Sequence, residues 1–429
     1  MFLSRTFRRL LRRGRGSEKY KMGCGPSSQV QSSNDSSDMK SNAPRDPAKA
    51  PKVELHVHLD GAWDGPHLYA MARKHVEQLP ISVNVNGEPQ PLRQAVLDAE
   101  DAASFLDQHV HLPSSTCTLS GFLAPFGWVN AIVLASIRAE GLGALEDFAL
   151  HFARRQRASN VIYTEVRWCP HLLLEPTVLG ASDGEVRYAA ARDVLEAVAR
   201  GLRRGESEFP GLRLRQILCC LDFMPHVSAD IARLLREVGR DCGCVGIDVA
   251  GGESHFGLPL SESPILQAVK DACAAGFGST IHAGEDKNTG GAASNVAVAI
   301  HEYGASRIGH GYLTLTDASV VDLAKGSGVH FECCPKSSLL TGGFAPRSRP
   351  WSDHPLCHFA ERGMSCGVNT DDPLMCGICF EDEFRLCLGD MGMASADMHV
   401  LTENAIKASF CTEGEKQELL TRVAEFYAT

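Results

Sequence analysis

The chain has 429 residues, of which 44% are hydrophobic and 22% are charged, a composition ordinary for a soluble globular protein. That length is enough for one large α/β domain. The formal net charge is −10, although residues 1–52 carry twelve Lys and Arg against four Asp and Glu. Because phosphate contacts supply most of the affinity for nucleic acids, the acidic body argues against nucleic-acid binding and favours a small-molecule partner.

Residues 1–50 are predicted to form a disordered, basic and Ser-rich tail, because residues 27–47 are nearly devoid of large apolar side chains. Two targeting signals compete within it. The opening MFLSRTFRRLLRRGRG has six Arg and no acid, as a mitochondrial presequence does. The motif MGCGPSS, which begins at Met22, fits myristoylation of Gly23 with Cys24 as a palmitoylation site, provided that translation starts at Met22.

A single myristoyl chain binds membranes only marginally, so stable lipid-mediated membrane contact through the tail needs both lipids. We therefore expect most of the protein to be cytoplasmic, with minor pools on membranes or in mitochondria. The alternative is a solvated tail without a targeting signal. Expression from Met1 and from Met22, with and without Gly23→Ala, separates these outcomes, because only a lipidated tail changes its distribution when Gly23 is lost.

An uncharged stretch from Leu112 to Ile137 is predicted to be a buried or pocket-covering helix. Pro113, Pro125 and Asn130 interrupt it. Because a membrane span needs about 20 consecutive apolar residues, we expect no transmembrane segment here.

Sixteen Cys in a chain of this length do not indicate a disulfide scaffold. Cys376 and Cys379 form one CxxC motif, which could hold a metal or take part in redox chemistry. A structural zinc needs a second pair of ligands at similar spacing, and none lies nearby in the sequence. We therefore expect reduced, buried thiols.

After Pro51, short runs of β-branched and apolar residues recur, most of them separated by stretches with helical spacing. The eight runs are 53–59, 161–168, 215–222, 245–250, 279–282, 307–309, 329–333 and 365–369, and the helical stretches include 186–202, 230–238, 295–303 and 318–326. Eight strands that alternate with helices predict a (β/α)₈ TIM barrel, in which each strand is buried on both faces. Residues 51–429 are therefore predicted to form one catalytic barrel.

Titratable residues follow four of these strands. His56 and His58 alternate at the end of the first strand, so their side chains share one face. The other strand ends are His282-Ala283-Gly284-Glu285, Gly309-His310-Gly311 and Asn369-Thr370-Asp371-Asp372-Pro373. Any one of these histidines could be a core residue bonded to a backbone carbonyl, but barrel enzymes hold their active sites at the carboxyl ends of the strands.

These residue types predict metal-assisted hydrolysis of a polar C–N or C–O bond. Three neutral His and one carboxylate would hold Zn²⁺ and leave one position for water. Zinc lowers the pKa of such a water to about 7, which provides hydroxide at neutral pH. One Glu and one further His remain for proton transfer, and one Asp remains to hold a substrate. The residues alone do not name that substrate.

Several segments occur in an order that resembles the adenosine deaminases of animals, members of the metal-dependent amidohydrolase-like barrels. They span residues 51–429 and are KVELHVHLDGA, YTEVRWCPHLL, ILCC, GIDVAG, HAGE, RIGHGY, HFECCP, SSLLTG and NTDDPL. The resemblance implies zinc ligands at His56, His58, His282 and Asp371. It also implies that adenosine and 2′-deoxyadenosine are deaminated to inosine and 2′-deoxyinosine, with release of ammonia.

The same resemblance implies the roles of the remaining site residues. Glu285 would donate a proton to purine N1, and His310 would orient the attacking water, to which Asp371 is also hydrogen-bonded. Asp372 would accept from N7 in a protonated or tautomeric purine, and the backbone N–H of Gly251 would bond N3. Further substrate contacts are implied at His58 and Asp60, and at Leu119, Phe122 and Phe126, which match an apolar lid over the purine.

Asp60 is predicted to select nucleosides over nucleotides. In adenosine deaminases this position lies near the ribose 5′-hydroxyl, and related deaminases of 6-methyl-AMP carry Asn there. A carboxylate would repel a 5′-phosphate. The chain departs from its animal relatives at Gly252, where they usually have Asp, and in a longer segment from about Ile81 to Thr116.

Two alternatives remain open. A deaminase of adenine, AMP or 6-methyl-AMP would use the same metal chemistry, and its turnover of these compounds relative to adenosine would reveal it. A catalytically inactive barrel that binds a protein partner would have lost a metal ligand or the acidic Glu, and this chain has lost neither.

Overall fold

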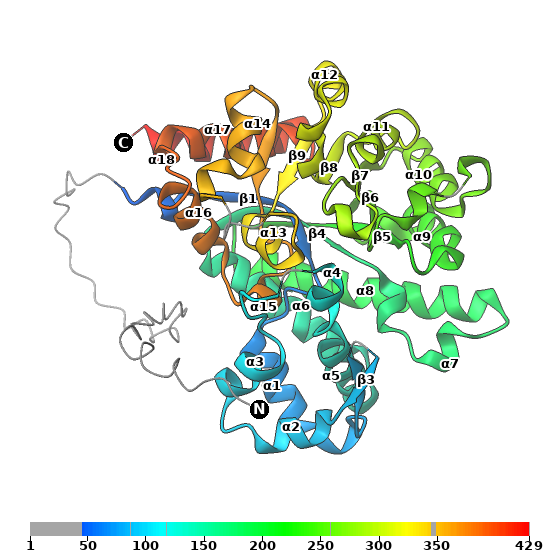
Figure 1. Ribbon diagram of the computed structural model, residues 1–429. Coiled ribbons are helices and arrows are strands. Elements are labelled where there is room, and N and C mark those ends of the chain that lie inside the picture. Colours follow the sequence, from blue (N-terminus) through cyan, green and yellow to red (C-terminus); the bar gives the residue numbers. More distant parts are fainter. Residues whose placement is uncertain (1–44, 86, 117, 258, 345–348, 429) are drawn as a thin grey trace, which may run out of the picture. The chain divides into compact units, whose positions relative to one another are not determined.

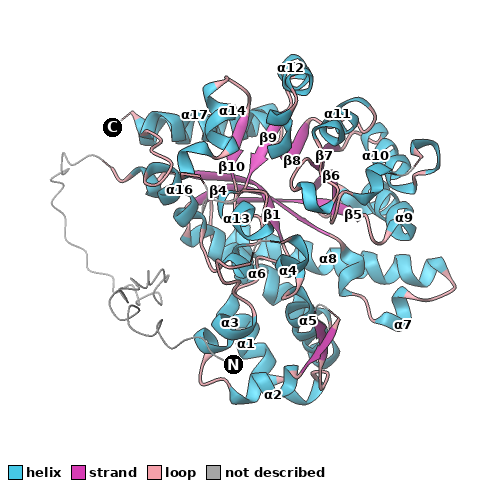
Figure 2. Ribbon diagram, in the orientation of Figure 1, coloured by secondary structure: helices cyan, strands magenta, loops and turns pink. Residues whose placement is uncertain are grey.

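The computed structural model describes residues 45–85, 87–116, 118–257, 259–344 and 349–428. Eight parallel strands form one sheet in the order β1-β4-β5-β6-β7-β8-β9-β10 (Figure 1; β10 is labelled in Figure 2). They are β1 Lys52–His58, β4 Val161–Trp168, β5 Arg213–Leu221, β6 Cys244–Ala250, β7 Gly278–Ala283, β8 Arg307–His310, β9 His330–Cys333 and β10 Cys366–Val368. Each of the eight predicted runs overlaps one of these strands.

Hydrogen bonds between β1 and the residues that follow β10 close the sheet into a barrel. His58 N donates to Asp371 O over 2.8 Å, and Asp371 N donates to His56 O over 3.0 Å. All eight residues of β4 are buried, as the closed parallel sheet predicts. The prediction of a (β/α)₈ barrel is confirmed.

Helices surround the strands (Figure 2). The helices between β4 and β10 are α7 Pro176–Leu179, α8 Gly184–Glu208, α9 Ser228–Leu234, α10 Pro264–Ala274, α11 Ala293–His301, α12 Ala318–Ser327, α13 Pro335–Thr341 and α14 Pro355–Glu361. After β10 come α15 Pro373–Cys376, α16 Phe380–Leu388, α17 Ser395–Ala408 and α18 Glu413–Tyr427. The four predicted helical stretches fall on α8, α9, α11 and α12, and the stretch 230–238 continues past α9 into a π-helical turn at Leu235–Gly239.

The connection from β1 to β4 is long and contains the predicted lid residues. It contains α1 Gly65–Lys74, the hairpin β2 Val83–Val85 and β3 Glu88–Gln90, α2 Leu92–Asp98, α3 Ala102–His109, α4 Leu119–Leu123, α5 Phe126–Glu140 and α6 Leu142–Ala158. In the described part of the chain, Leu119–Glu140 is the one segment that is long and apolar enough to cross a membrane, and 44% of its apolar window is buried. Trp128, Val129, Ile132 and Val133 of α5 pack into the hydrophobic core.

Residues 45–50 belong to the fold, so the prediction of a disordered tail is wrong for these six residues. Pro47–Lys49 form a 3₁₀ turn, and Ala48 and Ala50 are buried. Small apolar side chains that pack on the barrel outweigh the polar composition from which disorder was predicted. The presequence-like and MGCGPSS segments lie outside the described residues.

Candidate metal centre and active site

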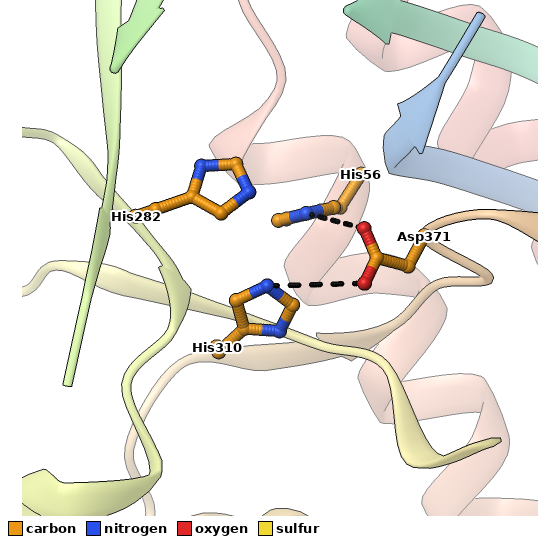
Figure 3. A group of neighbouring side chains, drawn as sticks. All are labelled: His56, His282, His310 and Asp371. Carbon is orange, nitrogen blue, oxygen red and sulfur yellow. Dashed lines mark ion pairs between the residues drawn. The ribbon is translucent and has the colours of Figure 1, made fainter. Parts of the chain in front are cut away.

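Five side chains from the carboxyl ends of barrel strands meet at one centre. His56 and His58 lie on β1, His282 on β7, and His310 ends β8, while Asp371 follows β10. One ligand atom from each of His56, His282, His310 and Asp371 lies within 4.8 Å of the others, and all four residues are buried (Figure 3). This group contains three of the four predicted metal ligands, His56, His282 and Asp371, and it includes His310 in place of the predicted ligand His58.

His58 reaches this centre as well. Its Nε2 lies 3.2 Å from Nε2 of His282 and 3.3 Å from Oδ1 of Asp371. Nε2 of His56 lies 3.2 Å from the same Oδ1, whereas Nε2 of His310 lies 3.9 Å from Oδ2 of Asp371. Imidazole nitrogens and carboxylate oxygens at these separations are a donor set suited to a divalent cation.

Buried carboxylates hold two of the imidazoles by their other ring nitrogen. Nδ1 of His56 lies 2.8 Å from Oε2 of Glu332, and Nδ1 of His282 lies 3.1 Å from Oδ2 of Asp248. A ring that donates its Nδ1 proton to a carboxylate presents an unprotonated Nε2, which is the form that binds a metal. Glu332 and Asp248 were not predicted from the sequence, and both lie inside buried strands.

Two arginines compensate these buried carboxylates. Arg167 donates to Asp248 over 3.0 Å and to Glu332 over 2.6 Å, and Nε of Arg307 lies 2.7 Å from Glu332. Burial alone would raise the pKa of Glu332, but the two guanidinium groups hold it well below its usual range. Charged residues inside strands that are buried on both faces are the sequence signal that could have revealed this network, because a buried charge requires a partner.

His310 and Asp371 adopt left-handed backbone conformations, with φ values of 64° and 63°. Such a conformation costs a residue with a side chain about 1–2 kcal/mol, and surrounding contacts must impose it. For Asp371 they include the barrel-closing hydrogen bonds and Ser337 Oγ, which donates to Oδ2 over 2.5 Å. Backbone strain of this kind concentrates at active sites, so it agrees with a functional role for both residues.

Glu285 faces the same centre, with Oε2 at 3.7 Å from Nε2 of His310. Glu253, which the sequence analysis did not single out, accepts hydrogen bonds of 2.8 Å from the backbone N–H groups of Gly284 and Glu285 and so fixes this loop. Burial and the nearby charge of Asp371 raise the pKa of Glu285 to about 8. A carboxyl group that is protonated near neutral pH can act as a general acid.

Asp60 and Asp372 are two further buried carboxyl groups next to the centre. A β-carbon on Gly61 would come within 1.7 Å of Oδ1 of Asp372, so the turns that follow β1 and β10 are in direct contact. Burial raises the pKa of Asp60 to about 6. Burial and the charges of Asp371 and Asp60 raise the pKa of Asp372 well above its usual range. These groups give the site hydrogen-bonding capacity beyond the metal ligands.

The predicted lid residues gather on one side of the centre. Leu119 and Phe122 of α4 form an apolar cluster with Leu340 of α13, and Phe126 packs against it. Because α13 also carries Ser337, which bonds Asp371, the cluster lies beside the metal centre. It therefore has an apolar side chain, that of Leu340, on the same helix as a residue that bonds the predicted metal ligand Asp371.

Comparison with known proteins identifies the family. A sequence model of the adenosine deaminase family matches residues 51–426. The adenosine deaminases of Bos taurus and Xenopus tropicalis are each 32% identical to the chain, over 88% of its length and over 94% and 96% of theirs.

Solved structures show the same fold at lower identity. The adenine deaminase of Arthrobacter aurescens superposes with a TM-score of 0.68 at 22% identity, over 89% of this chain and 100% of that one. The Arabidopsis N6-mAMP deaminase gives a TM-score of 0.67 at 20% identity, over 89% and 99%. The family match over residues 51–426 and the two animal relatives show that the chain belongs to the adenosine deaminase family and is a hydrolytic deaminase of adenosine-like purines.

Proposed function

We propose that the protein hydrolyses adenosine and 2′-deoxyadenosine to inosine and 2′-deoxyinosine, with release of ammonia. The observation that carries this proposal is the position of Glu285, a buried carboxyl group beside His310 at a centre of imidazoles and one carboxylate. A proton donor that faces a metal-binding centre supplies what hydrolytic displacement of a ring amino group needs. The animal relatives named adenosine deaminase support adenosine as the substrate.

Zinc is the proposed metal, with His56, His58, His282 and Asp371 as its ligands. Zinc binds imidazole and carboxylate groups at about 2.0–2.2 Å in tetrahedral sites, which places neighbouring ligand atoms about 3.4 Å apart. The separations of 3.2 Å and 3.3 Å among these four residues fit that spacing, and the 3.9 Å between His310 and Asp371 fits it less well. A fold neighbour from Burkholderia ambifaria contains bound Zn.

The proposed reaction assigns proton transfer to Glu285 and His310. Zinc would supply a water of lowered pKa. Glu285 donates a proton to purine N1, which draws electrons from C6 and prepares that carbon for attack. His310 is 3.7 Å from Glu285 and 3.9 Å from Asp371, a position from which it can orient the attacking water and accept its proton. His310 then passes that proton to the amino group of the tetrahedral C6, the C–N bond breaks and ammonia leaves, and the C6 hydroxyl returns a proton to Glu285 as it becomes the carbonyl of inosine.

The remaining predicted residues hold the purine. Asp372 is proposed to hydrogen-bond N7, and the N–H of Gly251 to bond N3. Leu119, Phe122 and Phe126 would cover the base. An apolar cover excludes bulk water and so strengthens the polar contacts beneath it.

Asp60 is proposed to exclude nucleotides, and Asp60→Asn tests this. At about 4 Å and an effective dielectric constant near 20, a carboxylate and a phosphate charge repel each other by about 4 kcal/mol. Asp60→Asn should therefore raise the AMP-to-adenosine ratio of kcat/KM by at least tenfold and by at most about a thousandfold. Adenosine itself should bind only modestly more weakly, because the amide oxygen still accepts from the 5′-hydroxyl.

The matched control is Asp390→Asn, which removes an exposed carboxylate and should leave the ratio unchanged. An unchanged ratio in Asp60→Asn would mean that Asp60 does not select against phosphate. Wild-type turnover of adenosine, adenine and AMP separates the proposal from its nearest rival. If the wild-type protein preferred adenine or AMP, the proposed substrate would be wrong and the protein would be a deaminase of that other 6-aminopurine.

A further inference from the structure

The carboxyl end of β5 carries two side chains that the proposed mechanism does not use, Asp222 and Phe223. Asp222 N donates to Ala250 O over 3.1 Å, so Asp222 lies beside the end of β6, directly before Gly251. A β-carbon on Gly251 would lie 2.2 Å from Oδ1 of Asp222 and 3.3 Å from Cδ1 of Phe223. Both side chains therefore lie against the α-carbon of Gly251.

Asp222 offers a fixed hydrogen-bond acceptor. Ser254 Oγ donates to Oδ2 of Asp222 over 2.8 Å. Among the described residues no group donates to Oδ1, and the side chain is half-buried. Because one oxygen is anchored and the other is not, the carboxylate can accept a hydrogen bond from a ligand without losing its own support.

Phe223 adds an apolar surface next to this acceptor. Its side chain is 61% exposed, although it is a large hydrophobic residue. An exposed aromatic ring beside a carboxylate presents an apolar face and a hydrogen-bond acceptor together. A sugar, which has a C–H face and hydroxyl donors, matches both.

Asp222 also explains the departure at Gly252. A β-carbon at this position would lie 3.2 Å from Oδ2 of Asp222. An Asp in place of Gly252 would bring a second negative charge against Asp222, which is unfavourable. Gly252 is therefore compatible with Asp222 in a way that a second carboxylate is not.

We propose that Asp222 is a specificity-determining residue that accepts a hydrogen bond from a secondary hydroxyl of the ribose, with Phe223 against the sugar ring. This inference rests on the proposed function, in which the N–H of Gly251 bonds purine N3. N3 is bonded to C4, and C4 is bonded to the nitrogen that carries the sugar. Groups packed on Gly251 therefore lie at the sugar edge of the base, and the enzyme favours nucleosides that carry the bonded hydroxyl.

The test compares kcat/KM for adenosine, 2′-deoxyadenosine and 3′-deoxyadenosine in the wild type and in Asp222→Ala. A hydrogen bond to a charged acceptor supports an expected loss of about tenfold for adenosine, mainly through KM. The loss should be less than twofold for whichever deoxynucleoside lacks the bonded hydroxyl, so the wild-type preference disappears. Asp222→Asn keeps the shape and a neutral acceptor, and it should give an intermediate preference even if Asp222→Ala does not fold.

Ser254→Ala is the control, because it removes the anchoring hydrogen bond and leaves the carboxylate in place. It should retain the preference for the hydroxyl. Equal losses for all three substrates in Asp222→Ala, or no loss, would overturn the role of Asp222 and leave it as a support of the loop. A wild-type protein that deaminates none of the three nucleosides would instead refute the proposed function, and this inference with it.

Discussion

Replacing Glu285 with Gln is expected to lower kcat for adenosine by about 10²–10⁴-fold, the usual contribution of general acid–base catalysis. The amide keeps the shape of the side chain but cannot give a proton to N1. Glu253 bonds the backbone N–H groups of this loop, so the loop should keep its position. Steady-state kinetics together with elemental analysis should show a large fall in kcat with the metal retained.

Glu302→Gln provides the matched control, because Glu302 is exposed beyond the end of α11. It should have kinetics close to the wild type. If Glu285→Gln also stayed within about threefold of the wild type, another group would have to donate the proton to the purine.

His58→Ala and His310→Ala are both expected to reduce activity strongly, but for different reasons. His58 lies 3.2 Å from His282 and 3.3 Å from Asp371, close to the spacing of about 3.4 Å expected for ligands of one tetrahedral zinc. Its loss should remove the metal. His310 lies 3.9 Å from Asp371 and faces Glu285, so its loss should lower kcat and leave the metal bound.

Metal content after dialysis distinguishes the two variants. His301→Ala, a change at an exposed histidine at the end of α11, should leave both metal and activity intact. If His310→Ala lost the metal and His58→Ala kept it, the roles of these two histidines would be exchanged.

The sequence predicted the barrel because closure of a parallel sheet demands apolar strands. β4 Val161–Trp168 has the bounds predicted from the sequence, since its run of β-branched and apolar residues has polar or turn-forming neighbours at both ends. The strand ends were equally informative. An alternating pair such as His56 and His58 projects to one face of a strand, and the structure places both side chains at the centre.

What the sequence did not predict depends on contacts between distant strands. Nothing in the sequence around Glu332 and Asp248 distinguishes them from ordinary charged residues. Only the closed barrel shows that each contacts a different histidine. Arg167 donates hydrogen bonds to both carboxylates. These contacts join residues far apart in the sequence, so no local sequence pattern predicts them. The left-handed backbone of Asp371 likewise follows from barrel closure against β1 and not from local sequence preference.

The boundary of the fold was also missed for a physical reason. Residues 45–50 are polar on average, but burial of Ala48 and Ala50 and the 3.2 Å ion pair between Asp46 and Arg385 attach them to the barrel. An average of composition over a window of residues cannot detect an attachment made by so few side chains.

The most direct test of the account measures metal content and reaction product on the same sample of purified wild-type protein. We expect close to one zinc per chain and conversion of adenosine to equal amounts of inosine and ammonia. Strong chelation should abolish this activity, and added zinc should restore part of it. Full activity in protein that elemental analysis shows to be free of metal would contradict the account, as would zinc-loaded protein that leaves adenosine unchanged.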